Sequence, residues 1–235
     1  MKRLFALLFI SLILLSLCSC SGLELTPEIE EYINFYKTAV ENTVTNKSAT
    51  VKVSSVTKDN AIEFTTNTSV IEFVFKIEND KVLFDRNDYL NDELSAIYTC
   101  DGNSVFVKNS GDTKSSDVTE QNKAFLYADK NPFVTLSLFR VDNEGKINNS
   151  VLKDVKKYTE GEYTVVEFAL SDKAVSTILG YTKADGVVRE SAGNTRKYYI
   201  DSNSKICKIQ IDSNQRIISN GVEGEYITSM TVEIS

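Results

Sequence analysis

Ile71-Glu72-Phe73-Val74-Phe75-Lys76-Ile77 is the stretch that decides the fold, because a large apolar residue occupies every second position. A period of two is typical of a β-strand with one buried face, since successive side chains point to opposite sides of a sheet. We therefore expect Phe73 and Phe75 to face a core. Ala49, Val51 and Val53 repeat the pattern upstream, which predicts a neighbouring strand.

The alternation returns along most of the chain, with turn-forming residues between the segments. Asp101-Gly102 separates two such segments and is a good hairpin signal. Later segments are Arg196–Ile200 and Lys205–Ile211, joined across Asp201–Ser204, and Tyr226–Ile234. So many strands tend to curl rather than lie flat. The expected fold class is α+β: a single curved antiparallel β-sheet, an incomplete barrel, with helices packed on the concave face.

A helix is expected directly before the first strand. Thr26 suits the N-cap, Pro27 suits the first helical position, and Glu28 faces the positive end of the helix dipole. Apolar residues then recur at steps of three and four, which predicts one packed face. They are Ile29, Ile33, Tyr36, Val40 and Val44.

Two segments further along are harder to interpret from periodicity. Lys123–Val141 is apolar and contains Asn131-Pro132, a possible helix start, yet Val134, Leu136 and Leu138 also alternate as in a strand. Both interpretations stay open. Asn109–Asn122 is polar and predicts a loop, whereas Ser171 predicts the cap of a short helix over Asp172–Leu179.

The N-terminus predicts export and lipidation. Lys2-Arg3 and the apolar run Leu4–Leu17 form a signal-like start, too short for a membrane-spanning helix. Leu17-Cys18-Ser19-Cys20 then resembles the lipobox of bacterial lipoproteins, whereas a plain secretory signal would leave the position of Cys20 to chance. We expect residues 1–19 to be a signal peptide, 20–26 an acylated N-terminus and short tether, and 27–235 one domain. Cys20 would hold the protein on the extracytoplasmic face of the cell membrane.

Charge and composition exclude several classes of function. Removal of Lys2 and Arg3 lowers the 26 basic residues to 24, against 33 acidic residues, a net charge of −9 that argues against nucleic-acid binding. The chain has no His, so Ser-His and Cys-His catalysis and His-ligated zinc are excluded. No cofactor and no metal site are expected. Cys100 and Cys207 could form one disulfide. Nothing in the sequence indicates that their strands are neighbours, however, so we expect free thiols.

Three stretches carry a resemblance to a known family. They are the hairpin Ile97–Val107 with its Asp-Gly turn, the Pro-led segment Asn131–Leu136, and the late hairpin Arg196–Ile209. Together they resemble the lipoprotein-carrier (LolA-like) superfamily of extracytoplasmic lipid-binding proteins. The resemblance covers most of residues 28–235. It implies an incomplete barrel, plugged by helices, whose concave face holds acyl chains.

The sequence therefore predicts a non-enzymatic, membrane-anchored binding module for lipid or another apolar ligand. A curled sheet leaves an apolar concavity that short helices fill incompletely, and ligands bind in such clefts. The expected cavity residues are Ile29, Ile33, Tyr36, Val40, Phe73, Phe75, Phe133, Leu136 and Phe139. Two alternatives stay open: an envelope sensor or protein-interaction module with a filled core, and a cell-envelope hydrolase, which the missing nucleophile motifs disfavour.

Overall fold

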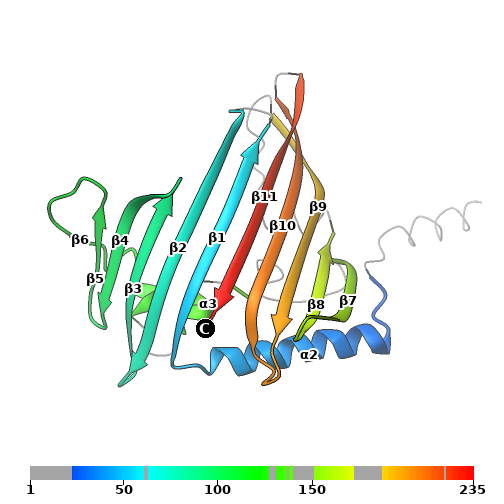
Figure 1. Cartoon of the computed structure of the whole chain (residues 1–235), viewed down its shortest axis with the longest axis horizontal. Helices are drawn as coiled ribbons and strands as arrows, with labels where there is room; N and C mark the ends of the chain where they lie inside the picture. Colours follow the sequence, from blue (N-terminus) through cyan, green and yellow to red (C-terminus); the bar gives the residue numbers. More distant parts are fainter. Residues whose placement is uncertain are drawn as a thin grey trace, which may run out of the picture.

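The computed structural model describes residues 23–60, 63–126, 131–136, 138–139, 151–171, 187–219 and 221–235. Its main feature is one antiparallel sheet of 11 strands (Figure 1). The strands are β1 (Ser48–Asp59), β2 (Thr65–Glu78), β3 (Lys81–Leu90), β4 (Glu93–Asp101), β5 (Val105–Asn109), β6 (Ser116–Asp117), β7 (Leu152–Glu160), β8 (Tyr163–Leu170), β9 (Val187–Ile200), β10 (Ile206–Ser219) and β11 (Val222–Ile234).

The sheet is open, because its first and last strands do not pair with each other. The order is β6-β5-β4-β3-β2-β1-β11-β10-β9-β8-β7, so the C-terminal strand β11 lies beside β1 in the centre. Val51 of β1 pairs with Phe73 on one side and Ile234 on the other. The predicted single antiparallel sheet and α+β class are confirmed. That the helices occupy its concave side stays a prediction.

The helix α2 (Pro27–Val44) packs on one face of this sheet, which we call the helix-bearing face. Thr26 caps it as predicted, accepting a hydrogen bond from the backbone N–H of Ile29 at 3.3 Å. The ring of Tyr36 lies 5.1 Å from that of Phe168 in β8 and 4.5 Å from that of Tyr198 in β9. The apolar stripe of α2 is therefore what attaches the helix to the sheet.

The segment with two open interpretations forms helical turns. It contains the 3₁₀ turn η2 (Lys123–Phe125) and the short helix α3 (Pro132–Thr135). The side chain of Asn131 accepts from the N–H of Phe133 at 3.0 Å and donates to the carbonyl of Val44 at 2.5 Å. One side chain thus starts α3 and fixes it to the end of α2.

The structure corrects the boundaries of the late strands and of one predicted loop. Strands β9 to β11 are longer than the predicted segments, because backbone pairing continues through polar residues that interrupt the hydrophobic alternation. The predicted loop Asn109–Asn122 contains the short strand β6, which pairs with β5. The predicted helix Asp172–Leu179 lies outside the described residues, as do the signal peptide and Cys20.

The two described cysteines are free thiols, as predicted. Cys100 is buried in β4, and burial raises the pKa of its thiol. Cys207 in β10 is only partly buried, although its place beside Ile209 predicts a core position. A register shift between Ile206 and Lys208 explains the difference, since it gives the core position to Ile206, which is 1% exposed.

Candidate functional site

All nine predicted cavity residues belong to one apolar cluster on the helix-bearing face. Five of them are buried: Ile33, Tyr36, Phe73, Phe75 and Phe133. The other four are partly buried and pack against these: Ile29, Val40, Leu136 and Phe139. The sequence therefore identified residues that meet in space. That a ligand contacts these residues stays a prediction.

Aromatic rings fill the centre of this cluster. The ring of Phe133 lies 5.1 Å from Phe75 in an edge-on arrangement and 5.7 Å from Phe139. Phe73 in turn lies 5.8 Å from Phe75 and 5.2 Å from Phe84. Such separations are those of directly packed aromatic pairs. The buried members therefore contact one another, and exposed apolar surface has to be sought at the border of the cluster.

On the central strands, that border includes four partly buried apolar side chains, which we call the apolar strip: Val53, Ile71, Ile211 and Met230. Val53 pairs with Ile71 across β1 and β2, and Ile211 pairs with Met230 across β10 and β11. Each lies two residues from a buried core residue of the same strand, so all four point to the helix-bearing face. They lie on four neighbouring central strands, β2, β1, β11 and β10.

Beyond the strip, the same face carries buried polar side chains. Three of them, Asn194, Ser213 and Gln215, lie on β9 and β10, and we call them the polar group. They are 5%, 9% and 5% exposed. Asn194 of β9 pairs with Ser213 of β10, and Ser213 lies two residues beyond Ile211. The face therefore changes along its strands from a ring-filled core, through the apolar strip, to buried polar groups.

The polar group has buried oxygens that lack partners within the described part of the chain. They are Oδ1 of Asn194, Oγ of Ser213 and Oε1 of Gln215. A buried acceptor without a hydrogen bond costs about 1–3 kcal/mol of folding free energy. Native proteins satisfy nearly all such groups, so an exception calls for an explanation. This cluster is the feature of the face that a solid apolar core does not explain.

Tyr198 and Arg196 lie between the core and the polar group on β9. Burial raises the pKa of Tyr198, which is 0% exposed, and the nearby guanidinium of Arg196 opposes the rise. Burial also raises the pKa of Tyr36 well above its ordinary value, and its hydroxyl donates to the carbonyl of Phe139. Both tyrosines therefore stay protonated near neutral pH, as structural groups that do not supply a base.

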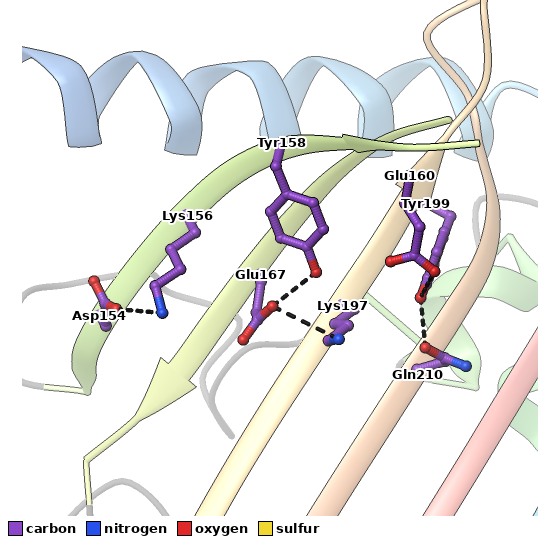
Figure 2. A network of polar contacts seen from close by, with 8 residues as sticks. All are labelled: Asp154, Lys156, Tyr158, Glu160, Glu167, Lys197, Tyr199 and Gln210. Atoms are coloured by element: carbon purple, nitrogen blue, oxygen red, sulfur yellow. Dashed lines mark hydrogen bonds and ion pairs between the residues drawn. The ribbon is translucent and has the colours of Figure 1, made fainter. Parts of the chain in front are cut away.

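The opposite face of β7 to β10 carries a polar network (Figure 2). Glu167 accepts from the hydroxyl of Tyr158 at 2.8 Å and pairs with Lys197 at 3.8 Å, while Tyr199 donates to Gln210 at 2.6 Å. Burial and Glu167 raise the pKa of Tyr158 to about 12. A nucleophile or general base at neutral pH needs the opposite shift, so Tyr158 is suited to neither role.

Two hollows lie at polar edges of β9 and β10. One of about 340 Å³ is lined by Glu160, Gly161, Glu162, Tyr163, Tyr199 and Lys208. The other, of about 260 Å³, is lined by Gly193, Asn194, Thr195, Asp212, Ser213, Asn214, Ile227 and Ser229. Strand alternation directs most of these side chains away from α2. Neither hollow is lined by any of the nine expected cavity residues, so neither is the expected lipid cavity.

The described residues offer neither a metal site nor a membrane-spanning helix. They contain no group of three acidic or sulfur-bearing side chains arranged to hold a metal ion. None of their helices combines the length and the hydropathy needed to cross a bilayer.

The sequence missed the polar group. Its three members follow the same two-residue step as the apolar positions: Ser213 and Gln215 continue the series from Ile211, and Asn194 continues it from Arg196. The two-residue step therefore continues through these positions. Hydrophobic alternation does not reveal it, because polar residues at inward positions resemble the end of a strand.

Comparison with known proteins gives similar solved structures at low sequence identity. No family model matches the chain, and no curated protein sequence matches it. The solved structure of the Mycobacterium tuberculosis lipoprotein LppX is 13% identical with a TM-score of 0.45, covering 88% of this chain and 94% of that chain. A LolA superfamily protein from Nitrosomonas europaea is 10% identical with a TM-score of 0.27, covering 87% and 91%. The second of these proteins belongs to the superfamily that the sequence resembles.

Proposed function

We propose that the protein is a non-enzymatic, membrane-anchored extracytoplasmic lipoprotein that binds a lipid or another apolar ligand on its helix-bearing face. One observation carries the proposal: the apolar strip of Val53, Ile71, Ile211 and Met230 is only partly buried, although it lies directly beside the ring-filled core. Burial of such surface against an acyl chain contributes about 25 cal/mol for each Å² removed from water.

The ligand lies against the strip and the partly buried members of the cluster. Leu136 and Phe139 come from the α3 region, and Ile29 and Val40 from α2, so both helices border this surface. The buried rings of Phe73, Phe75 and Phe133 then form the floor against which the helices and the ligand are held. Close packing of these rings is compatible with ligand binding, because the proposed acyl chain lies beside the rings and not between them.

The anchor brings this surface close to its ligand source. With Cys20 acylated, the tether Ser21–Thr26 spans at most roughly 20–25 Å, at about 3.3–3.6 Å per residue. The domain therefore stays near the outer surface of the cell membrane. An acyl chain can then move between bilayer and protein without a long path through water.

An envelope-protein interaction module is the second candidate function. The close ring packing around Phe133 favours it, because a filled core leaves less room for a ligand. In that case the same face or its edges would meet a protein partner. The two functions differ in whether an apolar probe binds at the strip.

Photo-crosslinking tests the proposal. The lipidated full-length protein, in detergent micelles, is labelled with a diazirine-bearing fatty acid methyl ester, and the adducts are mapped by peptide mass spectrometry. We expect adducts on the β10 and β11 peptides that contain Ile211 and Met230. Ile211→Glu should remove most of the labelling. Val74→Glu is the control, because Val74 is 50% exposed and lies on the opposite face of β2.

Labelling spread evenly over both faces would contradict the proposal. So would equal loss of labelling in Ile211→Glu and Val74→Glu. Capture of an envelope protein without any adduct at the strip would favour the interaction module. Thermal melts of both variants establish that each is folded before labelling is compared.

A further inference from the structure

The polar group gives information about the chemistry of the ligand. Asn194, Ser213 and Gln215 lie on the helix-bearing face and are each at least nine-tenths buried. Their three oxygens lack hydrogen-bond partners among the described residues. A carbonyl oxygen of Asn or Gln only accepts hydrogen bonds, so a partner for it has to donate.

Position connects this group to the apolar strip. Ser213 is two residues from Ile211 and four from the buried Ile209 on the same strand, a span of roughly 13 Å at about 3.3 Å per residue. Asn194 is directly opposite Ser213, and Gln215 is opposite Tyr226. A molecule with its tail on the strip therefore places its other end among the three oxygens.

We propose, resting on the function proposed above, that the ligand is an amphiphile with an uncharged headgroup that carries hydroxyl or other hydrogen-bond donors. Its tail covers the apolar strip, and its donors satisfy the oxygens of Asn194, Ser213 and Gln215. The buried oxygens are a cost in the free protein and become favourable contacts in the complex. The site therefore distinguishes headgroups while it accepts a range of tails.

The surroundings favour a neutral headgroup over an anionic one. An anion would have to lie beside the carbonyl oxygens of Asn194 and Gln215, which repel it, and among these three oxygens only the hydroxyl of Ser213 could donate to it. Asp59 adds a carboxyl group on the same face, 7% exposed, opposite Tyr226 in the register. The positive charge of Arg196 would attract an anion. In the register, however, Arg196 pairs with Ile211 of the apolar strip, so it lies beside the tail of the ligand and not beside its headgroup. A free fatty acid is accordingly the informative competitor.

The test compares three competitors that have the same tail and different headgroups. The lipidated full-length protein in detergent micelles is labelled with the diazirine fatty acid methyl ester, and labelling is competed with monooleoylglycerol, methyl oleate or oleic acid. Monooleoylglycerol carries two hydroxyl donors, methyl oleate carries none, and oleate carries a negative charge. We expect monooleoylglycerol to compete about tenfold more strongly than methyl oleate, as one or two net hydrogen bonds would give.

The matched variant replaces the polar group by apolar side chains of similar size: Asn194→Leu, Ser213→Ala and Gln215→Met together. We expect the two neutral competitors to become equal, because the acceptors are gone. We also expect the melting temperature to stay the same or rise, since the variant removes unsatisfied buried oxygens. A purely structural role for these side chains would lower the melting temperature and leave the preference intact.

Each other outcome is decisive. If wild type binds monooleoylglycerol and methyl oleate equally, this inference is wrong while lipid binding stands. A preference for oleic acid would also overturn it and would point to Arg196. If the diazirine ester does not label the strip, the proposed function itself fails, and the inference fails with it.

Discussion

The hydroxyl of Thr43 connects α2 to β10: it accepts a hydrogen bond from the backbone N–H of Ile206 at 2.8 Å and donates one to the carbonyl of Ala39 at 2.7 Å. Thr43 is 0% exposed and Ile206 is 1% exposed. The N–H of Ile206 lies at the first position of β10. A single side chain therefore fixes the end of the helix against the start of a strand more than 160 residues later.

Loss of that hydroxyl should destabilise the fold. Thr43→Val keeps the shape of the side chain but leaves the buried N–H of Ile206 without its acceptor, at a cost of about 1–3 kcal/mol in the free energy of unfolding. Urea denaturation followed by circular dichroism measures the change. Thr43→Ser restores the hydroxyl and should recover most of the loss. Equal stability of the Val variant and wild type would refute this role.

The ring of Phe133 should be one of the most sensitive positions of the core. It is 0% exposed and packs against Phe75 and Phe139, so Phe133→Ala should lower the free energy of unfolding by about 3–5 kcal/mol. Its neighbour Val134 is in the same helix but is 52% exposed. Val134→Ala should change stability by about 0.5 kcal/mol or less. Similar losses in both variants would show that α3 contributes as a unit rather than through Phe133.

Asp101 should contribute to the acid sensitivity of the protein. Hydrogen bonds from the backbone N–H groups of Asn103 and Ser104 lower its pKa below the ordinary value of 3.8. A lowered folded-state pKa gives stability that is complete above the unfolded value and is lost as pH falls through the folded one. Asp101→Asn keeps an acceptor for the turn but removes the titration, so its stability should fall less steeply below pH 4.

A second Asp101 variant separates the charge from the turn. Asp101→Ala removes the acceptor as well, so it should be less stable than wild type at every pH from 3 to 8. Chemical denaturation at several pH values supplies both comparisons. An acid limb in Asp101→Asn as steep as in wild type would assign the sensitivity to other groups.

Membrane attachment should depend on Cys20. Cys20→Ser removes the sulfur that carries the lipid, so the protein should move from the detergent phase to the aqueous phase in a Triton X-114 partition. The lipid supplies the anchor because each buried methylene contributes about 0.8 kcal/mol. Metabolic labelling with a fatty acid should be lost in the same variant. Retention in the detergent phase would mean that the apolar N-terminal run remains attached.

Hydrophobic alternation was enough to predict the central strands. Phe73 and Phe75, at alternate positions of the opening stretch, are 1% and 2% exposed. Thr26 and Pro27 likewise predicted the start of α2, because capping is a local property of the chain. These predictions succeeded because neighbouring residues in the sequence supply the deciding interactions.

Interactions between distant segments were not accessible in this way. The segment near Phe133 is compatible with strand or helix by periodicity, and the structure resolves it through the contact of Asn131 with Val44. Hydrophobic alternation predicts an end of β10 at Ile211, before its true end at Ser219, because Ser213 and Gln215 are polar residues at inward positions. Ser213 and Gln215 are nevertheless buried in the folded protein, and periodicity alone cannot predict that burial.

The open order of the sheet also leaves two lateral strands whose outer backbone groups face no partner strand in the described chain. An unpaired edge invites a strand of another molecule to add to the sheet. At one side β6 is only two residues long, Ser116–Asp117, too short to offer a continuous ladder. At the other side β7 carries Lys153, Asp154, Lys156 and Lys157, whose charges would be brought against an incoming chain. The open sheet thus has two borders that are unsuitable for polymerisation.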